Sequence, residues 1–327
     1  MSPETVGAGS AGEPITQRIG RVIGRAGILI PFLIAFAVLS LISPPFLRVG
    51  NLSNILDQQA GIIIVACAGT FVMIAGGIDL SIGAIYGLAG AVALTTATSV
   101  SSPVGILAGL SVGLAVGLVN GLIVTRFRIN PLIGTLAMSF VVSGIATIVT
   151  TGNLVVALDR LDFQAFAATR ILGLTSAAWM MIATAILALI LLSRTTFGRY
   201  VYATGGNTQA ARLGGVRINA VRVATFALSG TAAALAGTLD ASRVLSAQAS
   251  GGSFLTFTVL TGIIVGGTSI LGGEGTIGRT VLGCLFVALI ANGFNLLGLD
   301  PFYQQVTLGV ILLLAVGVDA WSRRFES

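Results

Sequence analysis

The chain alternates long apolar segments with short polar ones from residue 27 almost to its end. Most apolar segments are ~16–22 residues long, close to the ~20 residues that an α-helix needs to cross the hydrocarbon of a bilayer. Prolines and polar helix caps mark several boundaries between them. The pattern predicts ten membrane-spanning helices, at Gly27–Ile42, Asn51–Ala75, Ile82–Thr98, Val104–Thr125, Leu132–Thr151, Ser176–Ser193, Val223–Leu239, Phe254–Leu271, Ile277–Leu297 and Tyr303–Val318.

Composition supports a lipid environment for these segments. Of the 327 residues, 55% are hydrophobic and only 9% are charged, whereas soluble domains carry about 25% charged residues. The fold class is therefore all-α, a polytopic membrane protein, and ten spans are compatible with five-plus-five inverted pseudo-symmetry. We expect a disordered cytoplasmic tail at residues 1–26, one transmembrane domain at 27–319 and a short cytoplasmic tail at 320–327.

The charged residues predict the orientation of the spans. The net charge is +6, and all 17 basic residues are Arg. With the N-terminus inside, thirteen of these Arg are cytoplasmic and four are outside, as the positive-inside rule requires. Topology therefore accounts for the basic charge, and no nucleic-acid partner is expected, although contact with anionic membrane lipid is.

Several kinds of chemistry are excluded by what the chain lacks. It has no His, and its two cysteines, Cys67 and Cys284, lie inside apolar runs without metal-ligand spacing. The stretch 273–280 resembles a phosphate-binding loop, but Arg279 stands where Lys is needed and the stretch joins two membrane segments. Because no close acid pair lies in the membrane segments either, we expect no catalytic site, no metal and no cofactor.

The fourth span carries five glycines at a spacing of four residues. Small residues on one stripe let membrane helices approach closely, so the spacing predicts a tightly packed, central helix. The glycines are Gly105, Gly109, Gly113, Gly117 and Gly121.

A polar break, GGIDLS at residues 76–81, separates the second and third spans. Its Asp79 is the only charge between Asp57 and Arg126, and an ionisable residue in a membrane segment is a functional candidate by default. Three roles stay open: a structural or gating role in which Asp79 caps the next helix through Ser81, lining of the pathway, or a solvated charge near the cytoplasmic face. The candidates for the pathway or its gate are Asp79, Ser81, Asn120, Phe71, Asn292 and Asn295.

The longest polar segment, Arg194–Arg222, holds five Arg and no Asp or Glu. Within it, Asn207 or Thr208 can begin a short helix, and Gly214 or Gly215 can end it. Such a helix fits either a solvated loop or a groove in another protein. The candidate docking residues are Asn207, Gln209, Ala210, Ala211, Arg212 and Gly215.

A set of motifs resembles the permease subunit of the ribose/xylose/galactose class of bacterial ABC sugar importers. Each motif is weak alone, but the set is specific and covers about residues 45–320. In chain order the motifs lie at 51–56 (NLSNIL), 77–83 (GIDLSIG), 120–121 (NG), 130–136 (NPLIGTL), 196–199 (TFGR), 205–207 (GGN), 210–212 (AAR), 267–269 (GTS) and 292–293 (NG).

The resemblance implies a helical permease of the bacterial inner membrane, usually dimeric. Its partners would be a second permease subunit, in a homodimer for example, a cytoplasmic ABC ATPase, and a periplasmic or lipid-tethered sugar-binding protein. The run QAARLGG at 209–215 is similar to the coupling loop of ABC importers, with Gln209 in place of a Glu. The implied function is alternating-access transport of a monosaccharide, with ATP hydrolysed by the partner and not by this chain.

A stand-alone secondary transporter of a small neutral solute is the alternative. It would need coupling-ion sites within the membrane, and Asp79 is the only acidic residue in the middle of the chain that is placed to supply one.

Overall fold

The computed structural model describes residues 28–322, which form a bundle of long helices with minimal β-structure. The tail predicted at 1–26 and the last residues of the other tail, 323–327, lie outside the described residues. The helices are α2 (Leu29–Ile42), α3 (Val49–Ile74), α4 (Ile82–Ser99), α5 (Ser102–Arg126), α6 (Pro131–Thr150), α7 (Leu161–Ala168), α8 (Ser176–Arg194), α9 (Thr196–Gly206), α10 (Thr208–Leu213), α11 (Ile218–Val244), α12 (Leu255–Val265), α13 (Ile277–Leu296) and α14 (Pro301–Ser322).

Each of the ten predicted spans is helical in the structure. Seven helices, α3 to α6, α8, α11 and α13, are long and apolar enough to cross a membrane, while α2, α12 and α14 are shorter apolar helices. The prediction of one helix over Phe254–Leu271 was too long. Helix α12 stops at Val265 because Gly266 and Gly267 follow, and Gly267 has a left-handed backbone (φ +83°) that ends a helix.

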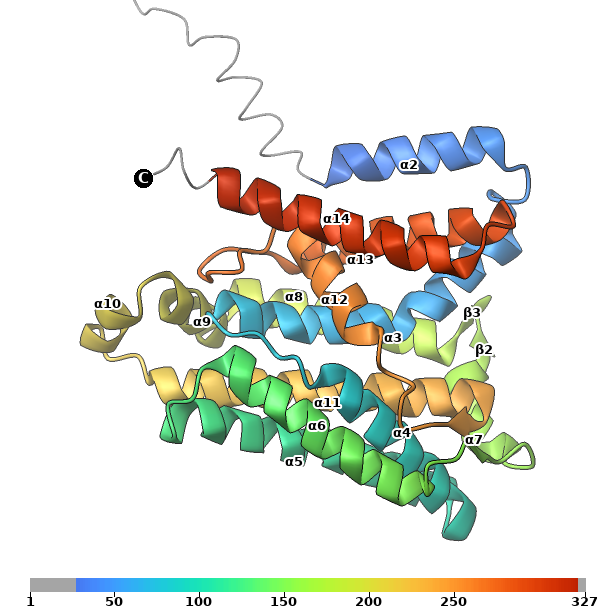
Figure 1. Cartoon of the computed structure of the whole chain (residues 1–327), viewed down its shortest axis with the longest axis horizontal. Helices are drawn as coiled ribbons and strands as arrows, with labels where there is room; N and C mark the ends of the chain where they lie inside the picture. Colours follow the sequence, from blue (N-terminus) through green and yellow to red (C-terminus); the bar gives the residue numbers. More distant parts are fainter. Residues whose placement is uncertain (1–27, 323–327) are drawn as a thin grey trace, which may run out of the picture.

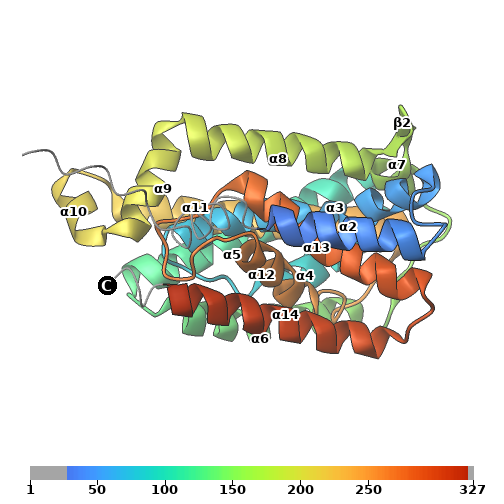
Figure 2. The same cartoon turned by 90° about the horizontal axis from the view of Figure 1, so that it is seen from above.

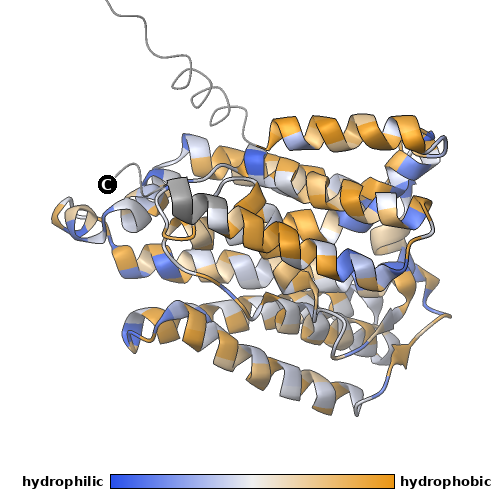
Figure 3. Ribbon diagram, turned by 45° about the horizontal axis from the view of Figure 1, so that its top comes forward, coloured by the Kyte–Doolittle hydropathy of each residue, from blue (hydrophilic) through white to orange (hydrophobic). Residues whose placement is uncertain are grey.

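The long helices run along the long axis of the bundle, so most connecting segments lie at one or the other of its two ends (Figures 1 and 2). Helices α9 and α10 lie at one end, here called the α10 end. Helix α7 lies at the other, the α7 end, with the strands β2 (Arg170–Ile171) and β3 (Leu174–Thr175). Hydrophilic residues gather towards these ends, and hydrophobic residues dominate between them (Figure 3).

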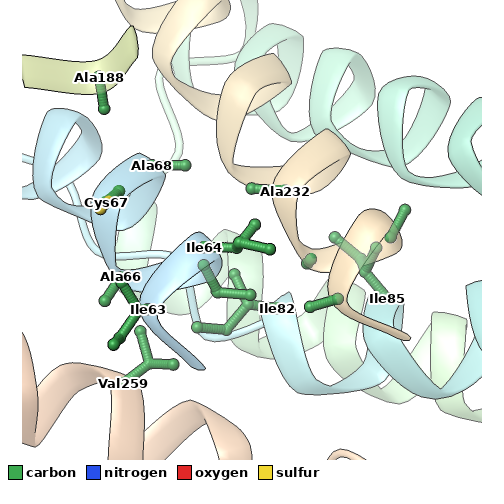
Figure 4. Packing of buried hydrophobic residues seen from close by; sticks show 14 of the residues in the cluster. Ile63, Ile64, Ala66, Cys67, Ala68, Ile82, Ile85, Ala188, Ala232 and Val259 are labelled. Atoms are coloured by element: carbon green, nitrogen blue, oxygen red, sulfur yellow. The ribbon is translucent and has the colours of Figure 1, made fainter. Parts of the chain in front are cut away.

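The centre of the bundle is built on α3, α4 and α11. In their most apolar windows 61%, 67% and 56% of the residues are buried, against 22–28% for α5, α6 and α8. In the middle of α3, Ile63, Ile64 and Cys67 are buried against side chains of the surrounding helices (Figure 4). The peripheral helices therefore leave apolar faces for lipid or for a second subunit.

The five glycines of α5 pack closely, as predicted, against α4 and α11. A Cβ on Gly109 would lie 2.9 Å from the Ala89 carbonyl oxygen, and one on Gly121 would lie 2.7 Å from Val223 Cα. The prediction that α5 is central was wrong, because its opposite face is open: Leu107 and Leu122 are 65% and 51% exposed. A glycine stripe brings one face of a helix close to its neighbours and says nothing about the other face.

The connection between the spans predicted at Leu132–Thr151 and Ser176–Ser193 contains α7 and three short strands. Strand β1 (Val155–Val156) pairs antiparallel with β4 (Ser246–Ala247), in the register Val155↔Ala247. Strands β2 and β3 form a second antiparallel pair. These pairs satisfy backbone groups of the connecting segments at the α7 end.

Candidate functional site

The polar break between α3 and α4 folds back into the bundle. Helix α3 ends at Ile74, Gly76 turns the chain with a left-handed backbone (φ +78°), and α4 begins at Ile82. The connecting trace leaves the α10 end of α3 and re-enters the bundle before α4 starts (Figure 1). Residues 75–81, here called the re-entrant segment, thus lie among helices and not in a surface loop.

Asp79 is the centre of a buried hydrogen-bond network within the re-entrant segment that joins this segment to α11. Its side chain is 4% exposed. One carboxylate oxygen, Oδ1, accepts from the Ser81 amide (3.0 Å) and the Ser81 hydroxyl (2.6 Å), and Oδ2 accepts from the Ser229 hydroxyl (2.8 Å). A buried carboxylate needs such donors, because burial without them costs several kcal/mol.

Two further helices hold the same segment. On α5, Asn120 donates from Nδ2 to the Ser81 hydroxyl (2.8 Å). On α6, Thr135 accepts at Oγ1 from the Leu80 amide (3.0 Å). The re-entrant segment is therefore fixed to α5, α6 and α11 by side chains from sequence positions far apart.

The depth of this network excludes one of the roles considered for Asp79. Asn120 is six residues before the end of α5 and Ser229 eleven residues after the start of α11. At 1.5 Å per residue, the network lies about 9–16 Å inside the α10 end. Asp79 is thus not a solvated charge at the α10 end. It accepts hydrogen bonds from Ser81, the residue before α4, but Ser81 makes no side-chain capping hydrogen bond, so a structural or gating role for Asp79 stays a prediction.

A polar cavity of about 550 Å³ lies between the re-entrant segment and the α7 end. Leu80 and Gly83 line its part nearest the re-entrant segment together with Gly252, whose backbone packs against Gly83. Asn153 and Leu154, which follow α6, line the part towards the α7 end. On α6, Ser139, Ser143 and Thr147 recur every four residues and so share one face. Hydroxyl and amide groups in an otherwise apolar bundle suit a neutral, hydroxyl-rich solute. The full lining is Leu80, Gly83, Ala84, Leu136, Ser139, Ser143, Thr147, Gly152, Asn153, Leu154, Gln248, Ala249, Ser250, Gly252, Ser253, Thr256 and Phe257.

At the opposite end, α10 projects from the bundle (Figures 1 and 2). Asn207 caps it by accepting from the Ala210 amide (2.9 Å), and Gly214 and Gly215 end it, Gly215 with φ +81°. The structure therefore confirms the short helix predicted here. Ala211 is buried, whereas Leu213 is 91% exposed.

Helix α9 fixes α10 to the bundle. The Phe197 ring stacks on Phe71 of α3, with centroids 6.1 Å apart. The Tyr202 hydroxyl donates to the Gly275 carbonyl (2.7 Å) in the connection before α13. A force applied to α10 can thus reach α3, next to the re-entrant segment, through packed side chains.

Comparison with known proteins places the chain in a family. The model of a family described as "branched-chain amino acid transport system / permease component" matches residues 51–316. The chain belongs to this family of permease components.

Relatives of the permease include the ribose import permease proteins RbsC of Escherichia coli K12 and Bacillus subtilis. They are 37% and 38% identical to it over 295 and 300 residues, covering 89% and 91% of this chain and 92% and 93% of theirs. The L-arabinose ABC transporter permease protein AraH of Azospirillum brasilense is 37% identical over 306 residues, 93% of this chain and 90% of its own. These similarities confirm the resemblance to sugar permease subunits of ABC importers. No solved structure matched.

The other predicted pathway residues lie apart from Asp79. Phe71 is buried in the core beneath α9. Asn292 of α13 exchanges amide hydrogen bonds with Asn51 of α3 (2.9 and 3.1 Å), and Asn295 is exposed near the end of α13. Only Asp79, Ser81 and Asn120 of the predicted set meet in one network.

Several residues of the site are absent from the set of predicted pathway and gate residues. Ser229 and Thr135 hold the re-entrant segment, and Gln248 and Thr256 line the cavity. The available signals were the isolated Ser229 inside an apolar span and the spacing of four residues along α6. For the segment 248–253 the sequence carries no local signal, because its place in the cavity depends on the β1–β4 pairing.

Proposed function

We propose that the permease translocates a monosaccharide of the pentose class through the polar cavity by alternating access. The observation that carries the proposal is the cavity itself, whose lining extends from Leu80 of the re-entrant segment to Asn153 beyond the end of α6. Its lining offers hydroxyl and amide groups and no charged side chain, which matches an uncharged polyhydroxylated solute. The pentose class is drawn from the relatives named for ribose and arabinose.

The α7 end faces outside in this proposal. Eight Arg of the described chain lie in the segments at the α10 end and four in those at the α7 end, so the positive-inside rule makes the α10 end cytoplasmic. The Arg residues at the α10 end are Arg126, Arg128, Arg194, Arg199, Arg212, Arg217, Arg222 and Arg279. Those at the α7 end are Arg48, Arg160, Arg170 and Arg243. An extracytoplasmic binding protein then delivers the sugar to the mouth of the cavity.

ATP hydrolysis is coupled to transport through α10. A cytoplasmic ATPase subunit binds the exposed surface made by Gln209, Ala210, Arg212 and Leu213. The permease acts as a dimer with two such helices. Movement of α10 is passed through α9 to α3 and from there to the re-entrant segment. The buried Asn120 Oδ1 has no hydrogen-bond partner within residues 28–322, so the network has an acceptor that an altered arrangement can satisfy.

Co-purification with the partner ATPase subunit tests the docking surface. We expect Arg212→Glu with Gly215→Trp to abolish ATPase association and sugar uptake. The matched control is Arg170→Glu with Gly173→Trp, because Gly173 has the same left-handed backbone (φ +86°), nothing lies within 4 Å of an added Cβ at either glycine, and the pair lies at the α7 end. Equal ATPase association in both variants would exclude α10 as the docking site.

Reconstitution separates this function from stand-alone transport. Uptake into proteoliposomes is expected only with ATPase, ATP and binding protein together. Uptake driven by an ion gradient in the absence of the ATPase would refute the proposal and support a secondary transporter.

A further inference from the structure

A second large groove lies at the α10 end, on the other side of the re-entrant segment from the polar cavity. It has a volume of about 1020 Å³ and is formed by the end of α5, the start of α6, α10 and the start of α11. Its lining includes Leu118, Leu122, Arg126, Arg128, Arg212 and Arg222.

Four Arg and no acidic residue line this groove: Arg126, Arg128, Arg212 and Arg222. The ion pairs within residues 28–322 are Arg160–Asp162 and Arg243–Asp240, both at the α7 end. In the described part of the chain, none of the four guanidinium groups has a carboxylate partner. Gathering like charges is unfavourable unless an anion lies among them.

The positions of the Arg side chains are set by three different segments. Arg126 is the last residue of α5, Arg128 follows in a left-handed turn (φ 55°), and Arg222, partly buried, lies in the second turn of α11. They approach because the α5 glycines bring α5 against α11. The groove is therefore a product of tertiary packing and not of one basic sequence run.

The deeper part of the groove is apolar. Leu118 and Leu122 of α5 are 40% and 51% exposed, and Val223 of α11 lines the facing wall. Leu118 is eight residues before Arg126, about 12 Å further into the bundle at 1.5 Å per residue. Charge at the membrane surface and an apolar wall below it match an amphiphile more closely than a small soluble anion.

We propose that this groove binds an anionic phospholipid, with its phosphate among the four Arg and an acyl chain along Leu118 and Leu122. Guanidinium groups bind phosphate through paired hydrogen bonds, and basic pockets between membrane helices at the cytoplasmic side suit anionic headgroups. The lipid joins α5 and α6 to α10 and α11. The proposal does not depend on which solute the permease carries.

Native mass spectrometry of the purified permease in neutral detergent tests the site. The probe is dioleoyl phosphatidylglycerol, compared with dioleoyl phosphatidylcholine, which has the same chains, and with glycerol 3-phosphate, which has a phosphate and no chains. We expect phosphatidylglycerol to bind in preference to both.

The variant combines Arg126→Gln, Arg128→Gln and Arg222→Gln, leaving Arg212 in place because it belongs to the proposed ATPase surface. At about fivefold in affinity for each Arg near the headgroup, we expect phosphatidylglycerol binding to weaken roughly a hundredfold. The control combines Arg194→Gln, Arg199→Gln and Arg217→Gln, which removes the same charge at the same end from residues outside the groove lining. Size-exclusion profiles and far-UV circular dichroism check that both variants fold.

Three results would overturn the proposal. If the control variant loses as much phosphatidylglycerol binding as the groove variant, the lipid is attracted by the general positive charge of this end. Equal binding of glycerol 3-phosphate would make the site one for soluble anions. Full phosphatidylglycerol binding by the groove variant, with lost ATPase association, would assign the four Arg to an acidic surface of the partner protein.

Discussion

Replacement of Gly117 by Ala tests the packing of α5 against α11 at a single residue. The added Cβ would lie 2.5 Å from the Phe226 carbonyl oxygen and 3.0 Å from Ala227 Cα. Both are backbone atoms of α11, so no side chain can rotate away. Ordinary contact begins near 3.4 Å, and the difference between 3.4 and 2.5 Å means that the helices separate locally by about 0.9 Å.

The cost follows from that separation. A gap of ~0.5–1 Å forfeits about a quarter to a half of each dispersion contact along the interface, and overpacking in well-packed cores costs roughly 1–3 kcal/mol. Alanine also favours the helix over glycine by about 1 kcal/mol, which acts in the opposite direction. We therefore expect Gly117→Ala to lower the free energy of unfolding by about 0–2 kcal/mol.

Gly144→Ala separates these two contributions. Gly144 is also inside a membrane helix, α6, but nothing lies within 4 Å of an added Cβ. Only the helix preference remains, so this variant is expected to be neutral or more stable by up to about 1 kcal/mol. The difference between the two variants isolates the packing cost, roughly 1–3 kcal/mol.

Unfolding of both variants by SDS titration from neutral detergent micelles, followed by far-UV circular dichroism, measures this difference. The reasoning is refuted if Gly117→Ala is as stable as Gly144→Ala. That result would show that α5 and α11 separate without loss, and that the close approach at the glycine stripe does not stabilise the bundle.

Three further outcomes are expected from the site and from the α7 end. Asp79→Asn keeps an acceptor for Ser81 and should unfold like the wild type. Asp79→Leu should lower the free energy of unfolding by about 1–3 kcal/mol for each buried donor left unpaired, measured in the same SDS titration. Equal stability of the two variants would show that the network does not stabilise the fold. Ser143→Leu should block sugar uptake and leave ATPase association unchanged. Ser111→Leu, the same change on the exposed face of α5, should transport normally. Normal uptake by both variants would show that the sugar does not pass through the cavity. The hydrogen bond from Ser102, with Arg160 nearby, lowers the pKa of Asp162. Because the pKa of Asp162 is lower in the folded state, its ionised form stabilises the folded protein above the unfolded-state pKa of about 4, and this stabilisation is lost as the pH falls through the folded-state pKa. The Tm difference between wild type and Asp162→Asn should therefore be constant above about pH 5 and shrink below pH 4. A Tm difference that does not depend on pH would contradict this.

The sequence by itself determined where the long membrane helices lie. An apolar run long enough to cross the bilayer must satisfy its backbone groups internally, and a helix does so with neighbours four residues away. The same local logic predicted the Asn207 cap, the end of α10 at Gly214 and Gly215, and the contact stripe of α5. The segregation of Arg between the two groups of connecting segments also follows from residue order alone.

Only the tertiary structure decided which polar groups meet. Asp79 and Ser229 are 150 residues apart, and no periodicity links them. The depth of the re-entrant segment depends on how α5, α6 and α11 pack around it, since the same GGIDLS run could equally form a surface loop. For the same reason, the cavity between α6 and residues 248–253 and the Arg groove between α5 and α11 exist only where separate helices come together.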